Sequence, residues 1–309
     1  MSSLIENTIF NFKYKDWSLS ETFAYFAKGV ARELKIAPNF FLQNYETIAI
    51  EKFKKKWLIQ DYDKSYFNFN GAKLPDVSTN KNNLINLMVI FEDIFLFFCF
   101  YNDNYNKNRV LYFDPYMGEG PYGYTDGKFD ITVKKDDIVI DAGAWIGDFS
   151  AYAVTKGAIV YAFEPVKETF QLLCVTKDLN SKGIFPIQKG LGISECEMNI
   201  SIYENNSGAN SLVFEQSFLN EKIKLTTLDK FVEENKLSRV DFIKADIEGA
   251  ERDMLRGATN VLKTFAPKLA ICTYHLPDDP EVLEGIIKEA NPDYTVIHLR
   301  KKLFATVIK

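Results

Sequence analysis

The sequence has little of what disulfide-bonded and metal-binding proteins depend on. Its 309 residues include four cysteines, at positions 99, 174, 196 and 272, and two histidines. The cysteines are far apart and form no Cys-x-x-Cys pair, so neither a disulfide framework nor a tetrahedral zinc site is expected. We therefore predict reduced, mostly packed thiols and no bound metal.

A strong excess of charge and a long apolar run are also missing. The 37 Lys and Arg against 42 Asp and Glu give a net charge of −5, with no long basic run to attract nucleic acid. Residues 84–101 form the most apolar stretch, but Asn86, Glu92 and Asp93 interrupt it, whereas a membrane span needs about 20 nearly uninterrupted apolar residues. This stretch is typical of a buried helix or a pair of strands. The N-terminus has neither the basic start nor the apolar segment of a secretory signal, which predicts a cytoplasmic protein without a membrane segment.

Length and composition favour a globular protein of about two domains, since 47% of the residues are hydrophobic and 26% are charged. Residues 1–108 are rich in Phe, Tyr, Asn and Lys and contain helix-like patches. We predict that they form a mainly helical cap or the contact surface of a homo-oligomer. From residue 109 to the C-terminus, short β-branched runs alternate with helical ones, which predicts a second domain.

This alternation predicts the elements of the second domain. The predicted strands are 137–141, 159–163, 183–188, 240–244 and 268–274, and the predicted helices are 149–156, 168–180 and 280–290. Alternating strands and helices build a parallel sheet with helices on both faces. The last two strands, 294–299 and 303–308, are joined by only three residues, which predicts an antiparallel hairpin. The predicted fold is a doubly wound, Rossmann-like α/β sheet that closes with this hairpin.

The connection after the first strand, residues 141–148, is the most informative loop. In a doubly wound sheet the ligand binds at the carboxyl ends of the strands, where glycines let the backbone approach it. Gly143 and Gly147 suit this purpose. A dinucleotide fingerprint would also have glycine in place of Asp141 and Ile146, and a phosphate-binding Gly-Lys-Ser/Thr loop is missing from the sequence. The loop therefore argues against a pyrophosphate ligand.

Two acidic residues suggest a positively charged ligand instead. Asp141 suits the ammonium and sulfonium groups of S-adenosylmethionine, because opposite charges attract. Glu164 ends the second strand 23 residues later, the spacing at which an acidic side chain accepts hydrogen bonds from ribose hydroxyls in this topology. The alternative is that Asp141 caps the next helix and Glu164 is a solvated loop residue.

Four segments carry a resemblance to a known family. They are residues 138–149, 162–165 (Ala-Phe-Glu-Pro), 226–229 (Thr-Thr-Leu-Asp) and 242–251, which ends in Asp-Ile-Glu-Gly-Ala-Glu. From about residue 112 onward the chain resembles the FkbM family of S-adenosylmethionine-dependent methyltransferases. The resemblance implies an S-adenosylmethionine cofactor and methyl transfer to hydroxyl oxygens, often on sugars. One difference is Trp145, which stands where the family usually has Asn. The predicted cofactor-binding residues are Asp141, Gly143, Ala144, Trp145, Gly147, Glu164, Pro165 and Asp246.

Methyl transfer to an alcohol benefits from a group that takes the hydroxyl proton. His275 follows the strand 268–274 and Asp246 follows the strand 240–244. Neighbouring strands are about 4.8 Å apart, so adjacent strands would bring both side chains to the edge that holds Asp141. We predict that His275 is the base, with a capping or substrate-binding role as the alternative. Asp246 would orient His275, contact the cofactor or bind substrate hydroxyls.

The predicted acceptor is a small molecule with a hydroxyl group, a sugar or a nucleotide-activated sugar. Candidate substrate-binding residues are Tyr122, Tyr124, Asn210, Ser211, Lys244 and Glu248. The two tyrosines would stack on a ring or pack within a rigid aromatic loop, and Lys244 would face a developing oxyanion or be a solvated strand end. A non-catalytic S-adenosylmethionine-binding module and a nicotinamide-dependent oxidoreductase are the alternative functions.

Overall fold

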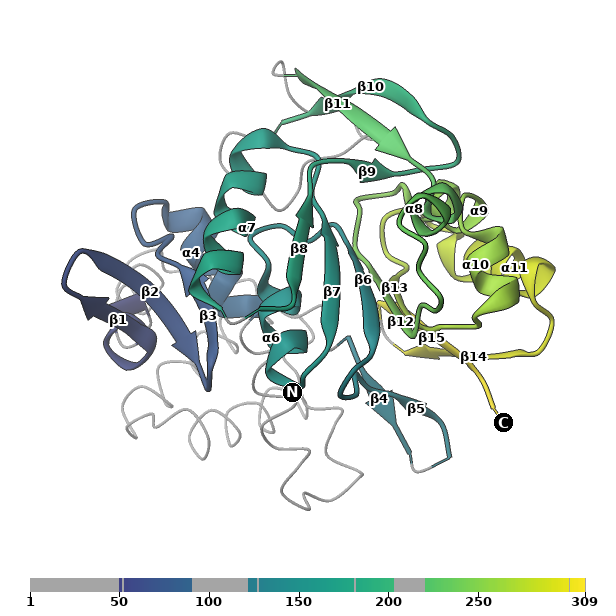
Figure 1. Ribbon diagram of the computed structural model, residues 1–309, viewed down its shortest axis with the longest axis horizontal. Coiled ribbons are helices and arrows are strands. Elements are labelled where there is room, and N and C mark those ends of the chain that lie inside the picture. Colours follow the sequence, from purple (N-terminus) through teal and green to yellow (C-terminus); the bar gives the residue numbers. More distant parts are fainter. Residues whose placement is uncertain are drawn as a thin grey trace, which may run out of the picture.

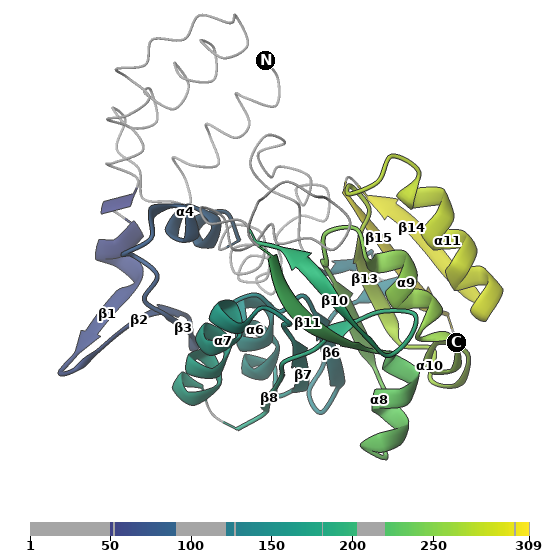
Figure 2. The same ribbon diagram turned by 90° about the horizontal axis from the view of Figure 1, so that it is seen from above.

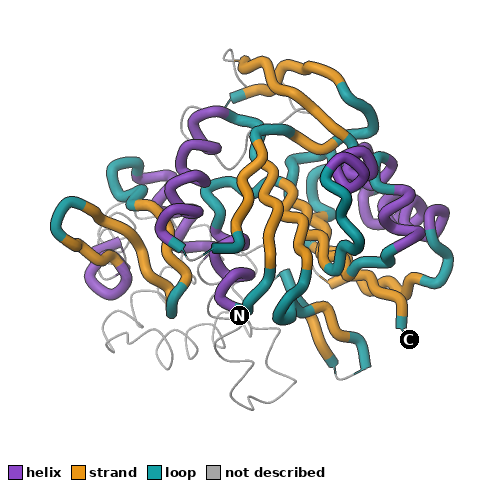
Figure 3. Tube along the Cα trace, in the orientation of Figure 1, coloured by secondary structure: helices purple, strands orange, loops and turns teal. Residues whose placement is uncertain are grey.

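A seven-stranded sheet forms the centre of the molecule. The computed structural model describes residues 50–90, 122–202 and 220–308, apart from positions 52, 127, 181 and 300. The sheet has the strand order β14-β15-β13-β12-β6-β7-β8 (Figures 1 and 3). Its strands are β6 (Ile138–Ala142), β7 (Ile159–Phe163), β8 (Ile184–Ile187), β12 (Phe242–Ala245), β13 (Lys268–Cys272), β14 (Tyr294–Leu299) and β15 (Lys302–Val307).

The pairing of these strands confirms the predicted fold class. Strands β8, β7, β6, β12 and β13 are parallel to one another, whereas β15 runs antiparallel to both β13 and β14. All four residues of β12 are buried, as expected of a central parallel strand covered on both faces. The predicted hairpin is present, with Leu299 paired to Lys302 at its turn.

Helices cover both faces of this sheet (Figure 1). On one face lie α6 (Asp148–Thr155) and α7 (Lys167–Leu179), and on the other lie α8 (Leu228–Glu234), α9 (Glu251–Arg256), α10 (Thr259–Thr264) and α11 (Asp279–Ala290). In α11, Leu283 and Ile287 are four residues apart on one face and both are fully buried. The apolar periodicity of α11 therefore buries one side of this helix.

A smaller sheet lies at the end of the central sheet where β7 and β8 finish (Figures 1 and 2). It consists of β9 (Gly190–Leu191), β10 (Cys196–Ser201) and β11 (Asn220–Thr226), in the order β10-β11-β9. Strands β10 and β11 flank the segment that contains Asn210 and Ser211. These two predicted substrate-binding residues lie outside the described part of the chain.

The N-terminal part contains a sheet that the sequence analysis did not predict. Strands β1 (Leu58–Asp61), β2 (Lys64–Phe69) and β3 (Ala72–Pro75) are antiparallel and are followed by α4 (Lys81–Ile90). A mainly helical segment was expected, but period-two burial of Phe67 and Phe69 favours a strand. Asn70 and Gly71, both with positive φ, form the two-residue turn typical of a β-hairpin. Of the apolar stretch 84–101, residues 84–90 belong to α4 and the rest lies outside the described residues. No helix within the described ranges is long and apolar enough to cross a membrane.

This N-terminal sheet packs against the helices of the central domain. The side-chain amide of Asn180, at the end of α7, donates to the Lys73 carbonyl at 2.6 Å and accepts from the Lys73 N–H at 3.0 Å. Leu74 belongs to the same buried cluster as Phe149 of α6 and Leu173 of α7. The described N-terminal residues therefore share a core with the sheet domain. The two-stranded sheet β4 (Tyr124–Thr125) and β5 (Asp130–Ile131) precedes β6.

Candidate active site

Two loops meet at the carboxyl edge of the central sheet. Strand β12 is adjacent to β6 in the sheet, so the loop that follows β6 and the loop that follows β12 are neighbours. In the first loop, Gly143 has a φ of +72°, and a Cβ atom there would lie 1.9 Å from the backbone oxygen of Asp246. Only glycine permits this approach. The Gly143 and Ala144 N–H groups both donate to the Phe163 carbonyl, at 3.1 and 2.9 Å, which ties the loop to the end of β7.

Asp141 is paired inside the protein. Its carboxylate is fully buried, with Oδ2 accepting from the Ser150 hydroxyl at 2.6 Å and Oδ1 lying 3.2 Å from Nζ of Lys244. Nζ of Lys244 also donates to the Gly143 carbonyl at 2.6 Å. Burial opposes the charge on Lys244, but Asp141 and Asp246 outweigh it and raise the pKa of the ammonium. Lys244 is therefore a buried partner of Asp141 rather than the solvated strand end that the sequence analysis considered.

Glu164 faces the same loop from the end of β7. Its carboxyl group accepts from the Trp145 N–H at 3.1 Å and from the Val166 N–H at 2.9 Å, and burial raises its pKa to about 8. Glu164 is thus not a solvated loop residue. Trp145 has a positive φ of 48° and packs its ring into the hydrophobic core. The bulky ring of Trp145 is therefore buried in the core, while its backbone N–H donates to Glu164.

The rest of the loop is closed by short-range contacts. Gly147, with a φ of +86°, donates its N–H to the Ala144 carbonyl at 2.7 Å and begins α6. The next residue, Asp148, is fully buried, and burial raises its pKa to about 7. Pro165 is half-buried at the start of the connection to α7. The predicted cofactor-binding residues are therefore together at one edge, where Glu164 accepts from backbone N–H groups and Asp141 and Asp246 face other side chains.

Asp246 stands between the two loops and is held by tyrosines. The Tyr122 hydroxyl donates to Oδ2 at 2.5 Å and the Tyr274 hydroxyl lies 3.4 Å from Oδ1. Burial favours the neutral acid, but Lys244 and His275 hold the pKa of Asp246 well below its usual range. Tyr122 was expected to stack on a ligand ring or to pack in an aromatic loop; its ring is buried edge to face against Phe149 at 5.6 Å, and its hydroxyl positions Asp246.

Tyr124 follows the packing alternative of the sequence analysis. Its ring stacks on Phe304 of β15, with 6.0 Å between ring centroids, and meets Phe129 edge to face at 5.8 Å. It is half-buried among these aromatic side chains. Tyr124 therefore packs within an aromatic cluster, which is the second of its two predicted roles.

His275 lies behind a set of carboxylates. Its Nδ1 is 3.0 Å from Oε1 of Glu251, and its Nε2 is 3.4 Å from Oε2 of Glu248 and 3.6 Å from Oδ1 of Asp246. Burial disfavours the charged imidazole, but these carboxylates outweigh burial and raise its pKa to about 9. The imidazole consequently holds a proton at neutral pH. This differs from the predicted free base and makes His275 a cationic partner of the acids.

Exposure separates the groups that a ligand reaches from those that support them. The side chains of Asp246 and Glu248 are 18% and 22% exposed, whereas that of His275 is 3% exposed. Asp246 and Glu248 are thus the accessible members of the cluster. Glu248 also has a positive φ of 53°, a strained conformation for a residue other than glycine.

Sequence reasoning missed three residues that shape this cluster. Glu251 is fully buried and accepts from the Ile247 and Gly249 N–H groups at 2.9 and 3.0 Å, which fixes the turn around Glu248. The Asp-x-Glu-Gly-Ala-Glu spacing was the signal for it. Tyr274 adjoins His275 in the sequence. The third, Lys302, has its ammonium 4.1 Å from the centre of the Tyr122 ring, and no local pattern indicated this contact.

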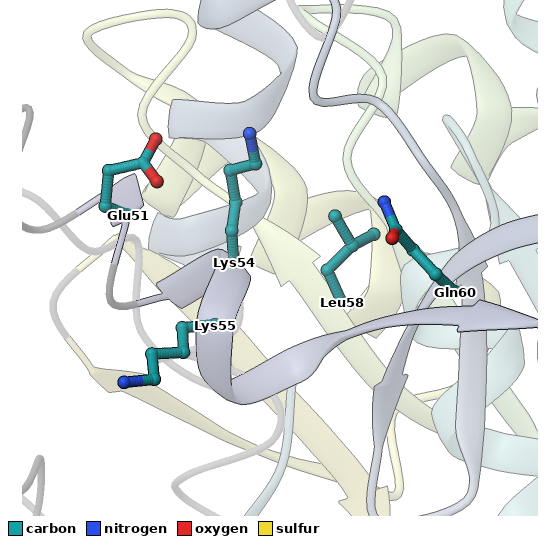
Figure 4. Close-up of a pocket in the computed structure, with 5 residues that line it drawn as sticks. All are labelled: Glu51, Lys54, Lys55, Leu58 and Gln60. Atoms are coloured by element: carbon teal, nitrogen blue, oxygen red, sulfur yellow. The ribbon is translucent and has the colours of Figure 1, made fainter.

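The other histidine and a surface hollow lie outside this edge. His298 is 39% exposed and lies 2.7 Å from Glu284 on the outer part of the sheet domain. A hollow of about 510 Å³ on the N-terminal part is lined by Glu51, Lys54, Lys55, Leu58 and Gln60 (Figure 4). Its two lysines point in different directions, so its charged groups do not converge on a ligand position.

Together these features define a doubly wound α/β protein with a polar, acid-rich site at the carboxyl edge of its sheet. Residues 141–296, just over half of the chain, match the methyltransferase FkbM domain. The chain belongs to this family and is a methyltransferase.

Three comparisons give the range of its relatives. It is 29% identical over 168 residues to hexuronic acid methyltransferase AglP of Haloferax volcanii, covering 54% of this chain and 68% of that protein. It is 26% identical over 207 residues to methyltransferase sdnD of Sordaria araneosa, covering 56% and 80% of the two chains. The crystal structure of an FkbM methyltransferase from Methylobacillus flagellatus is 26% identical, with a TM-score of 0.43, and covers 55% of this chain and 43% of that one.

Proposed function

We propose that this methyltransferase uses S-adenosylmethionine and methylates a hydroxyl group of a sugar or a sugar-containing metabolite. The observation that carries the proposal is the accessible pair Asp246 and Glu248 beside the glycine-containing loop that follows β6. Carboxylates bind sugar hydroxyls as hydrogen-bond acceptors. The similarity to a protein named hexuronic acid methyltransferase supports a carbohydrate acceptor.

The residues at the edge fit a positively charged cofactor. Buried Oδ1 of Asp141 makes no well-aligned hydrogen bond with a described residue, and Gly143 lets the loop approach the Asp246 backbone more closely than any side chain would permit. Glu164 lies at the end of the second strand, where an acidic group binds ribose hydroxyls in this topology. We assign Asp141, Glu164 and the backbone of residues 143–147 to the cofactor. Lys244, which lies against Asp141, would have to adjust when the cofactor binds.

The acceptor chemistry is assigned to the accessible carboxylates. When bound, S-adenosylmethionine supplies a methyl group on a positively charged sulfur, which keeps the C–S electron pair as the new O–C bond forms. Asp246 and Glu248 orient the acceptor hydroxyl, and one of them receives its proton. A carboxylate suffices because the hydroxyl becomes strongly acidic as its oxygen is alkylated. His275, predicted from the sequence as the base, instead positions the carboxylates in this proposal and does not itself take the proton.

Calorimetry and a methyl-transfer assay test the two parts of the proposal separately. We expect S-adenosylhomocysteine to bind, with an affinity that falls at least about tenfold in Glu164→Gln, since two ribose hydrogen bonds are weakened. Glu248→Gln should leave that affinity unchanged and lower kcat about 100-fold on the best substrate from a panel of uronic acids, neutral sugars and nucleotide-activated sugars.

Glu284→Gln is the matched control, because Glu284 is an exposed glutamate on α11 that is paired with His298. It should change neither quantity. Failure of both S-adenosylmethionine and S-adenosylhomocysteine to bind would exclude the cofactor assignment. Cofactor binding together with methyl transfer only to nitrogen or carbon acceptors would exclude the hydroxyl assignment.

A further inference from the structure

We propose that Asp246, Glu251 and His275 bind one divalent cation of the Mn²⁺ or Mg²⁺ class. One ligand atom from each residue can be chosen so that all three lie within 4.8 Å of one another. Ligand atoms held about 2.1 Å from one ion are about 3 Å apart when adjacent and about 4 Å apart when opposite. The spread of these atoms is therefore that of a single coordination sphere that needs only small side-chain adjustments.

The buried imidazole supplies an independent reason. Its side chain is 3% exposed; Nδ1 lies 3.0 Å from Oε1 of Glu251, whereas Nε2 makes no hydrogen bond with another described residue. Nε2 faces Asp246 and Glu248 at 3.6 and 3.4 Å, which is too long for a normal hydrogen bond. Buried polar atoms without a partner are rare and call for a ligand that satisfies them. An ion bound at Nε2 would give this nitrogen a partner.

Charge at this edge also favours a cation. The carboxylates of Asp246, Glu248 and Glu251 surround one imidazole, so the four groups carry an excess of negative charge even when the imidazole is protonated. Two buried ammonium groups, Lys244 and Lys302, also act on Asp246, and Lys244 is in addition paired with Asp141. A divalent ion would replace the imidazole proton and bind the neutral ring, because metal binding and protonation compete for the same nitrogen.

The donor set indicates the kind of ion. Two carboxylates and one imidazole offer mainly oxygen ligands, which suit Mg²⁺ and Mn²⁺ better than the soft metals that thiolates select. The consequence for catalysis rests on the proposed function: a cation here would bind the acceptor oxygen and lower the pKa of its hydroxyl. Glu248, which is not in the ligand set, would then receive the proton as the methyl group moves from sulfur to oxygen.

Mn²⁺ binding to the full chain tests this site directly. After removal of metals with a chelator, Mn²⁺ is titrated and the free ion is measured by electron paramagnetic resonance. We expect one Mn²⁺ per chain, with affinity reduced at least about tenfold in both Asp246→Asn and His275→Gln. His298→Gln is the matched control, because this histidine contacts an exposed glutamate away from the cluster, and it should bind Mn²⁺ like the wild type.

Competition between Mg²⁺ and Mn²⁺ for the wild-type protein tests the site even if a variant fails to fold. Mg²⁺ should displace the bound Mn²⁺ from the wild type. No Mn²⁺ bound by the folded wild type at millimolar concentration, or equal binding by folded Asp246→Asn, would overturn the cation site. S-adenosylhomocysteine calorimetry on the same chelated samples separates the two proposals: cofactor binding without Mn²⁺ binding removes only the cation site, and Mn²⁺ binding without cofactor binding removes only the proposed function.

Discussion

At the scale of single residues, the raised pKa of Glu164 should make the stability of the protein depend on pH. Burial raises its pKa from 4.5 to about 8. Between these values the native state keeps a proton that the unfolded chain has released, so the free energy of unfolding falls as pH rises. Relative to Glu164→Gln, which cannot titrate, the wild type should lose on the order of 1 kcal/mol per pH unit from about pH 5 to about pH 8. Urea unfolding of both proteins at each pH measures this difference.

The same titration on Glu284→Gln provides the reference, because Glu284 is 39% exposed and near the rim of the molecule. Its stability relative to wild type should change little over this range. A constant difference between wild type and Glu164→Gln at every pH would contradict a carboxyl group that stays protonated in the native state.

The sequence predicted where the site residues lie but not their charge states. Asp246 and His275 could be placed at one edge because each follows a strand, and strand ends of a parallel sheet coincide. Their charge states could not be predicted, because they depend on contacts such as that of Tyr122 with Asp246, 124 positions apart. The inward turn of Lys244 toward Asp141 is likewise a consequence of packing between neighbouring strands, which a single strand's sequence does not reveal.

At the scale of elements, the loop that follows β6 depends on one glycine. Gly143→Ala would place a methyl group 1.9 Å from the Asp246 backbone oxygen, at a φ of +72° that alanine rarely adopts. We expect a loss of about 3 kcal/mol or more in the free energy of unfolding, because both strain and a backbone clash must be relieved. Displacement of Asp246 should also reduce methyl transfer. Chemical denaturation and the methyl-transfer assay measure the two effects.

Gly285→Ala is the matched substitution in a helix. A Cβ atom at Gly285 would meet nothing within 4 Å, and alanine favours helix over glycine by up to about 1 kcal/mol. This variant should be as stable as the wild type or slightly more stable. Equal stability of both glycine variants would show that the two loops do not approach each other as closely as described.

The alternation of short β-branched runs with helical ones predicted the elements of the central sheet. Strand β7 and strand β14 have the predicted bounds, and α11 begins one residue before its predicted start. The N-terminal sheet was missed although Asn70-Gly71 marks its turn, since residues 1–108 were predicted as one mainly helical region from helix-like patches elsewhere in that stretch. The order of strands in the sheet was not predicted, because it depends, like the pairing of β9 with β11, on long-range contacts without a local signal.

At the scale of the whole molecule, the described N-terminal sheet and the methyltransferase sheet are parts of one core. Leu74 of β3 is fully buried in a cluster that includes Phe149 and Leu173. Leu74→Ala should therefore lower the free energy of unfolding by about 2–5 kcal/mol. Because the lost contacts join the two parts, the described region should still unfold in one transition, with the same midpoint by tryptophan fluorescence and by circular dichroism.

Val175 provides the comparison that separates shared packing from a general effect of lost methyl groups. It lies on α7 and is 43% exposed, so Val175→Ala should change stability by no more than about 0.5 kcal/mol. An early transition of Leu74→Ala, seen by fluorescence while the helical circular dichroism signal persists, would mean that the N-terminal sheet unfolds by itself. A single shifted transition would instead follow from a core in which β3 stabilises α6 and α7, and with them the loop that begins α6 at the candidate site.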